Sequence, residues 1–164
     1  MSSQNQAIII DSPGKASIHA CSEPTLRPDY LLIRTTALAL NPTDWKHIDY
    51  LATPNARVGC DYAGTIIAIG DAVTKQFKVG DSVAGFAHGG NAVYTEDGAF
   101  GNVITAKGDI QMKIPEGLSN IEASTLGVGI TTVGQGLYQS LGLPLPDKPA
   151  KEKFSVLIYG GEYL

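Results

Sequence analysis

Histidine and cysteine are the residue types that most often hold zinc or act as nucleophiles, and this sequence has three histidines and two cysteines. They are His19, His47, His88, Cys21 and Cys60. None stands at the close spacing of a zinc motif, and two cysteines can build neither a four-cysteine zinc lobe nor a disulfide framework. We therefore predict no metal site. Cys60 is expected to be a small core residue, because free cysteine is among the most buried residue types.

A positive charge for catalysis could come from Lys46, which follows residues 41–45 with the sequence NPTDW. An ammonium group can hydrogen-bond a developing anionic oxygen or relay a proton. The same lysine can also be a solvated side chain on a short helix that begins near Pro42. Asn41 and Asp44 fit a role in organising the loop, because Asn and Asp side chains cap turns. From spacing alone, both interpretations of residues 41–46 stay open.

Two glycine-containing segments bear on nucleotide binding. Gly127 and Gly129 begin a pattern like a dinucleotide fingerprint, but Thr132 replaces its third glycine. The segment also follows a predicted helix instead of a strand, which is the wrong context for that motif, so we interpret it as a helix break. Gly160 and Gly161 follow an apolar run and look like the first half of a phosphate-binding turn.

The composition describes one globular domain with many turns. The chain has 164 residues, of which 43% are hydrophobic and 17% charged, with 19 Gly and 9 Pro. That Gly and Pro content favours short strands joined by turns. The net charge of −4 argues against nucleic-acid binding. The sequence has no apolar stretch of the ~20 residues that span a bilayer and no signal-peptide pattern, so we expect a cytoplasmic protein that does not bind membranes.

The first two thirds of the chain read as β-structure. Apolar segments bounded by Gly, Pro, Asn and Asp predict strands within residues 7–10, 30–40, 58–69, 77–86 and 100–114. Short strands at such intervals are typical of a sandwich or a barrel. The elements that position residues 41–46 are therefore the strands on either side of them.

The pattern becomes helical after residue 115. Ser119 and Glu122 have the spacing of a capping box, which predicts a helix start there. Residues 131–141 carry apolar side chains at helical spacing. Three prolines and several charged residues make 144–153 an exposed linker. Residues 154–159 are almost continuously apolar, which is typical of a central strand in a parallel sheet.

The order of these segments resembles the N-terminal half of the medium-chain dehydrogenase/reductase superfamily, whose members pair a GroES-like β-barrel substrate domain with a Rossmann domain. The matching segments are NPTDWK at 41–46, GCDYAG at 59–64, VGDSV at 79–83 and VLIYGG at 156–161. The resemblance implies a mainly β fold with helices (α+β). It implies a GroES-like domain at 1–125, a connecting helix and linker at 126–153, and the first strand of a truncated dinucleotide-binding domain at 154–164.

Within that superfamily the sequence resembles the trans-acting enoyl reductases of fungal polyketide synthases, which also carry a TVGQGLY-type helix, here at 132–138. That family reduces α,β-unsaturated acyl thioesters with NADPH, acting on a chain that a carrier domain of the synthase delivers. The resemblance therefore implies NADPH as cofactor, a polyketide synthase as partner, and catalytic roles for Lys46 and Thr132. It also implies a set of cofactor-binding residues: Asn41, Thr43, Asp44, Trp45, Lys46, Gly160 and Gly161.

The resemblance also implies a zinc-free site, because Cys60 stands where zinc-dependent relatives have a histidine and residues 41–46 contain no cysteine. Two alternatives to an enzyme stay open: a non-catalytic module that binds acyl groups or a synthase, and an inactive truncated remnant. With most of the cofactor domain absent, we expect no NADPH binding by this chain alone. A strand at 154–159 would then have open edges, and we expect it to mediate self-association.

Overall fold

The structure is a computed structural model that describes residues 4–159 of the chain. It divides into two compact units, Met1–Thr131 and Thr132–Leu164, which are taken separately here. Gly160 and Gly161, the predicted phosphate-binding residues, lie outside the described residues.

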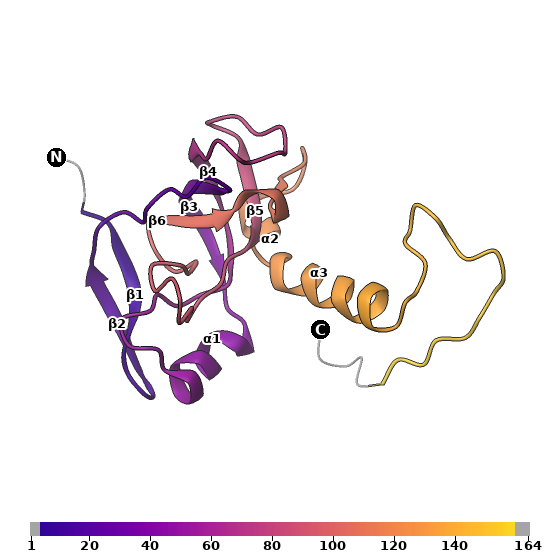
Figure 1. Cartoon of the computed structure of the whole chain (residues 1–164), viewed down its shortest axis with the longest axis horizontal. Helices are drawn as coiled ribbons and strands as arrows, with labels where there is room; N and C mark the ends of the chain where they lie inside the picture. Colours follow the sequence, from indigo (N-terminus) through magenta and orange to yellow (C-terminus); the bar gives the residue numbers. More distant parts are fainter. Residues whose placement is uncertain (1–3, 160–164) are drawn as a thin grey trace. The chain divides into compact units, whose positions relative to one another are not determined.

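The first unit begins with a hairpin of β1 (Gln6–Ser12) and β2 (Lys15–Ala20), paired antiparallel (Figure 1). Its turn places Gly14 at a φ of +75°, a left-handed conformation that glycine adopts at low cost. The sequence predicted β1, since its apolar run is evident, but it did not predict β2. Most of β2 is exposed, but its residues KASIHA alternate polar and apolar, a strand signal that the prediction did not use.

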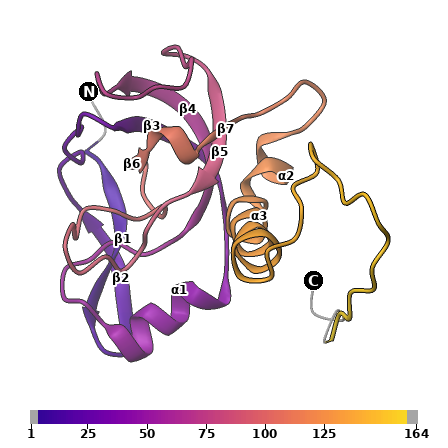
Figure 2. The ribbon, with the colours of Figure 1, turned by 45° about the vertical axis from the view of Figure 1, so that its right-hand side comes forward.

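The main sheet has five antiparallel strands in the order β6-β3-β4-β5-β7, and Figure 2 shows β7 beside β5. The strands are β3 (Tyr30–Ala39), β4 (Asp61–Ile69), β5 (Ser82–Phe86), β6 (Val103–Lys107) and β7 (Met112–Lys113). The predicted strands at 30–40 and 58–69 are confirmed as β3 and β4. The predicted segment 77–86 contains only the shorter β5, and the segment 100–114 contains two strands, β6 and β7.

Local breaks explain why those two segments are shorter than predicted. Gly80 has a φ of +95° and donates its N–H to the Ile66 carbonyl, which makes a turn before β5. A 3-10 turn, η2 (Gly108–Ile110), separates β6 from β7. Both breaks carry a Gly-Asp pair, at 80–81 and 108–109, which is a turn signal that the predicted bounds of the two strands did not use.

A single buried core joins the hairpin to the main sheet. The Ile8 N–H donates to the Phe100 carbonyl at 2.8 Å, and the Val58 N–H donates to the Ile8 carbonyl at 2.9 Å. Fully buried members of this core include Ile10, Leu31, Ile33, Tyr62, Ile66, Val83 and Ile104. The fold is therefore mostly β, as the composition predicted.

Gln111 links strand ends inside this unit through its fully buried side chain. It accepts a hydrogen bond from the Tyr62 hydroxyl at 2.7 Å. Its Nε2 donates to the carbonyls of Phe86 at the end of β5 (3.0 Å) and Lys107 at the end of β6 (2.9 Å). One polar side chain thus connects β4, β5 and β6.

Short helices complete the first unit. After β3 come α1 (Pro42–Lys46) and a continuing π-helical turn, η1 (His47–Leu51). The helix α2 (Asn120–Ser124) confirms the predicted capping box: the Glu122 N–H donates to the Ser119 hydroxyl at 3.2 Å, and the Ser119 N–H donates to the Glu122 carboxylate at 3.0 Å.

The next helix is α3 (Gly127–Val133), followed by a π-helical segment, η3 (Gly134–Ser140). These two elements confirm the predicted helix at 131–141. The helix break expected at residues 127–132 is wrong: α2 ends before Thr125 and Leu126, and Gly127 already begins α3. The glycine pattern at 127–132 is therefore helical in this structure and does not form a phosphate-binding loop.

The second unit departs from the sequence-based expectation at its C-terminal end. Residues 153–159 form no regular secondary structure, so the strand predicted at 154–159 is absent here. A strand is held by hydrogen bonds to a neighbouring strand, and none of the described strands pairs with this segment. The boundaries proposed at 1–125, 126–153 and 154–164 stay a prediction.

No helix among the described residues is long and apolar enough to cross a membrane.

Candidate functional site

The helix α1 carries most of the site residues that the sequence predicted. Asn41 precedes it in an extended conformation (φ −128°, ψ 152°), and Pro42 occupies the first helical position. Proline suits that position because its missing N–H would have no partner in the helix. The backbone N–H of Asn41 donates to Asp44 Oδ2 at 2.7 Å, which is one half of a capping box.

The outer face of α1 presents a cation beside an aromatic pair. Lys46 is exposed, and its Nζ lies 5.7 Å from the centroid of the Trp45 ring. Trp45 is 47% exposed and meets Tyr50 edge-to-face, with ring centroids 5.9 Å apart. This surface can stack a planar or apolar group on the rings and donate a charged hydrogen bond from the ammonium.

Behind α1 lies a buried pair of carboxyl groups bridged by an asparagine. Asp44 and Asp61 are 5% and 1% exposed. Asn41 contacts both, donating its backbone N–H to Asp44 and its side-chain Nδ2 to Asp61 Oδ2 at 2.9 Å. The second oxygen of Asp44 is buried with no hydrogen-bond partner among the described residues. Asn41 and Asp44 are thus occupied by internal contacts, and their predicted contact with a cofactor stays a prediction.

Burial dominates the electrostatics of this cluster. It raises the pKa of Asp44 and of Asp61 above their ordinary values, and the charge of Asp44 raises that of Asp61 further. Burial, followed by the charge of Asp44, raises the pKa of the Cys60 thiol to about 12. Cys60 is 2% exposed, which confirms it as a small core residue.

His47, which the sequence assigned no role, orders the segment around Thr43. Its Nδ1 lies 2.7 Å from the Thr43 carbonyl, so that nitrogen carries the proton in the neutral ring. The Thr43 hydroxyl lies 3.2 Å from the same nitrogen. The His47 ring meets the His88 ring edge-to-face at 6.4 Å. The four-residue spacing of Thr43 and His47 was the available signal, since residues i and i+4 are neighbours on a helix.

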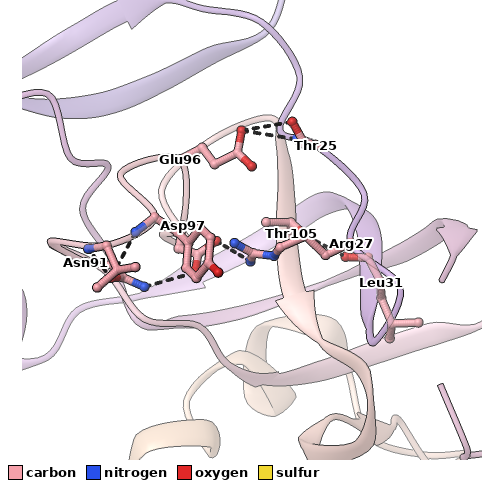
Figure 3. Close-up of polar contacts among 9 residues, drawn as sticks. Thr25, Arg27, Leu31, Asn91, Glu96, Asp97 and Thr105 are labelled. Atoms are coloured by element: carbon pink, nitrogen blue, oxygen red, sulfur yellow. Dashed lines mark hydrogen bonds and ion pairs between the residues drawn. The ribbon is translucent and has the colours of Figure 1, made fainter. Parts of the chain in front are cut away.

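A second polar cluster, missed by the sequence, holds the loop of residues 88–98 (Figure 3). Arg27 Nη2 donates to Asp97 Oδ1 at 2.5 Å, and Asn91 Nδ2 donates to Asp97 Oδ2 at 3.1 Å. The Arg27 guanidinium also lies over the rings of Tyr30 (3.6 Å) and Tyr94 (4.4 Å). Burial raises the pKa of Asp97, and the ion pair with Arg27 opposes that shift. These contacts pair the buried charge of Asp97 with that of Arg27 and connect the loop to the segment before β3.

Thr132, the second predicted catalytic residue, does not lie on α1. Thr132 is exposed near the end of α3 and is the first residue of the second unit. Within residues 4–159, no three His, Cys, Asp or Glu side chains gather closely enough to hold a metal ion. A cavity of about 230 Å³ between β1, β2 and β3 contains none of the predicted site residues.

The groups exposed on α1 suit one end of a nicotinamide cofactor. The half-exposed Trp45 ring can contact a planar ring, and the Lys46 ammonium can donate to an amide or carbonyl oxygen. The resemblance placed phosphate binding at Gly160 and Gly161, which lie outside the described residues. Cofactor binding by Trp45 and Lys46 stays a prediction.

Comparison with known families decides the relationship. A model of the alcohol dehydrogenase GroES-like domain matches residues 27–116. The chain belongs to this family. It is 57% identical over 157 residues to Trans-enoyl reductase TOXD of Cochliobolus carbonum, covering 95% of this chain and 53% of the relative. It is 52% identical to Trans-enoyl reductase resD of Aspergillus sclerotiorum, covering 94% of this chain and 47% of the relative. The chain spans about half the length of the curated relatives it matches.

Solved structures agree with this family assignment. The quinone oxidoreductase from Coxiella burnetii matches with a TM-score of 0.69 at 25% identity, covering 85% of this chain and 46% of that one. An alcohol dehydrogenase superfamily protein from Novosphingobium aromaticivorans matches with a TM-score of 0.72 at 26% identity, covering 82% of this chain and 42% of that one. The predicted relationship to the GroES-like N-terminal domain of the medium-chain dehydrogenase/reductases is confirmed.

Proposed function

We propose that this GroES-like domain serves an NADPH-dependent enoyl reductase that acts on α,β-unsaturated acyl thioesters in polyketide biosynthesis. The substrate would be presented by a carrier domain of a polyketide synthase. The observation that carries the proposal is the 57% identity to a trans-enoyl reductase over 95% of this chain. The proposal includes a cytoplasmic location, which rests on the sequence alone.

In this proposal NADPH, when bound, supplies the hydride for the double bond. Lys46 donates a hydrogen bond to the thioester carbonyl oxygen, where negative charge develops, and relays a proton toward the α-carbon. Thr132 orients the acyl carbonyl with one hydrogen bond from its hydroxyl. The exposed position of Lys46 on a capped helix supports its role, because the ammonium is free to meet a ligand.

A second candidate function is a module that binds acyl chains or a synthase without catalysis. The observation that favours it is an apolar surface on α1 and η1. Tyr50 and Leu51 are 74% and 66% exposed, next to the half-exposed Trp45. Exposed apolar patches of this kind often mark interaction sites.

A titration of the 164-residue chain with NADPH, followed calorimetrically, separates the two functions. Saturable binding and consumption of NADPH in the presence of an enoyl thioester would show that this chain acts as a reductase by itself, against our expectation that it does not bind NADPH alone. Lys46→Ala should then lower kcat/KM by about 100-fold, the typical loss of a general acid, and Thr132→Val should also lower it. The control is Lys15→Ala, an exposed lysine on β2. Equal rates for the two lysine variants contradict the assigned role, and thioester binding without turnover favours the binding module.

A further inference from the structure

Asp61 is a buried carboxylate whose two oxygens serve two distant segments. It is the first residue of β4 and is 1% exposed. Its Oδ2 accepts from Asn41 Nδ2 at 2.9 Å, and its Oδ1 accepts from the backbone N–H of Val128 at 2.7 Å. Burying a charge is costly unless donors surround it, and here each oxygen has one.

The contact with Val128 lies at the start of α3. The first N–H groups of a helix have no partner within the helix, and a negative charge there is favourable. Asp61 therefore acts as an acceptor for α3 from outside the helix. Gly127 permits this approach, since a Cβ at that position would lie 2.6 Å from Asp61 Oδ1 and 2.5 Å from the Gly85 carbonyl.

The contact with Asn41 lies at the start of α1. Asn41 is the residue that precedes this helix, and its backbone N–H is already engaged with Asp44. The hydrogen-bonded chain thus runs from Val128 through Asp61 and Asn41 to Asp44. It connects residues that are far apart in the sequence but meet at the ends of two helices.

We propose that Asp61 is a positioning residue that fixes the starts of α1 and α3 through one shared carboxylate, and so holds the helix that presents Lys46. The link to catalysis rests on the proposed function of Lys46, whereas the positioning itself does not. An amide at position 61 replaces the carboxylate poorly. It can accept from Val128, but its own NH2 group then meets the NH2 group of Asn41, and rotating the Asn41 amide to present its oxygen takes that oxygen away from the Asp44 N–H at the start of α1.

Trp45 allows a direct test, because it is the single tryptophan of the sequence and lies on α1 next to Lys46. Asp61→Asn should let α1 open locally, so that the Trp45 ring, now 47% exposed, becomes fully accessible. The acrylamide quenching of Trp45 should therefore rise roughly twofold. The circular dichroism spectrum should stay unchanged. The matched control is Asp29→Asn, an exposed acid paired with Lys107, which should leave quenching unchanged.

A rescue variant distinguishes positioning from a general loss of stability. Combining Asn41→Asp with Asp61→Asn keeps the net charge and the number of hydrogen bonds. The amide at position 61 then accepts from Val128 and donates to the new carboxylate at position 41. Quenching of Trp45 should return to the wild-type value. If Asp61→Asn does not fold, Asn41→Ser provides the test. Serine is suited to begin α1, but its shorter side chain cannot reach Asp61. This variant should raise the quenching of Trp45 and leave the circular dichroism spectrum unchanged.

The turnover assay forms a separate arm. If the wild type reduces an enoyl thioester, Asp61→Asn should lower kcat and the double variant should restore it. If the wild type shows no turnover, catalysis by this chain alone is excluded while the fluorescence result still decides the positioning role. Equal quenching in Asp61→Asn and Asp29→Asn, or failure of the double variant to restore the signal, would overturn the proposal.

Discussion

Replacing Gln111 with leucine should remove a large part of the stability of the first unit. Leucine has a similar size but can neither donate nor accept a hydrogen bond. Gln111→Leu therefore leaves the Tyr62 hydroxyl and the carbonyls of Phe86 and Lys107 without the partners they have now. All three groups belong to different strands, so the loss affects the connection between strand ends.

The magnitude follows from the burial of each group. The Tyr62 side chain is fully buried, and an unpartnered buried polar group costs about 1–3 kcal/mol. The bonds to Phe86 and Lys107 are only partly buried, so water replaces part of each loss and we assign about 0.5–1 kcal/mol to each. The expected decrease in the free energy of unfolding is roughly 2–5 kcal/mol, a large share of the ~5–15 kcal/mol typical of a domain.

Urea unfolding followed by circular dichroism measures this loss. The control is Gln76→Leu on the exposed loop before β5, which should change the free energy of unfolding by less than about 0.5 kcal/mol. Tyr62→Phe removes the hydroxyl, so the double variant with Gln111→Leu should lose less than the sum of the two single losses. A decrease below about 1 kcal/mol for Gln111→Leu, or strict additivity in the double variant, would refute the reasoning.

The remaining predictions concern other contacts of the domain. Burial raises the pKa of Asp44 in the folded protein above its ordinary 3.8, so the folded state loses stability relative to the unfolded state as pH rises and Asp44 ionises. The Tm of Asp44→Asn should therefore increase relative to that of the wild type from pH 4 to 7. A Tm difference that does not change with pH would contradict this. Gly127→Ala should lower the free energy of unfolding by about 2 kcal/mol through overpacking against Gly85 and Asp61. Gly129→Ala, which has open space at its Cβ, should raise the free energy of unfolding by up to about 1 kcal/mol. Equal effects of the two variants in urea unfolding would count against the close approach of Gly127 to these residues. Arg27→Met should cost about 3 kcal/mol, since it leaves Asp97 buried without its cation, and a stability near wild type in thermal unfolding would be inconsistent with that pairing. Leu157 is 92% exposed, so Leu157→Lys should reduce the self-association expected of residues 154–159. If the wild type is a monomer in size-exclusion chromatography, the expected self-association is wrong.

Elements controlled by nearby residues were predictable. The helix start at Ser119 and Glu122 depends on a spacing of three residues, and both hydrogen bonds are present. The cores of β3 and β4 follow from apolar runs bounded by Pro, Asn and Gly. The glycine turn at 79–83 was evident from the sequence and is closed locally by the hydrogen bond from the Asp81 N–H to the Lys78 carbonyl at 3.0 Å, whereas the hydrogen bond from the Gly80 N–H to Ile66, a residue of another element, was not predictable.

Two segments were assigned wrongly. The strand β2 was missed although its residues alternate polar and apolar and pair with β1, the strand directly before it in the chain. Residues 154–159 were predicted as a strand from their composition, but they have no strand partner among the described residues. Strand formation is a property of a pair, so a single segment predicts it poorly.

The sequence by itself determined the family, the mainly β character, the capped start of α2 and the exposed lysine that follows the NPTDW segment. These features depend on residue types, order and short spacings. The tertiary structure alone decided that Asp61 meets Asn41 and Val128, that Gln111 joins three strands, and that Arg27 neutralises Asp97. Each of these contacts joins residues from separate parts of the chain, and a buried polar group is stable only where folding brings it a partner.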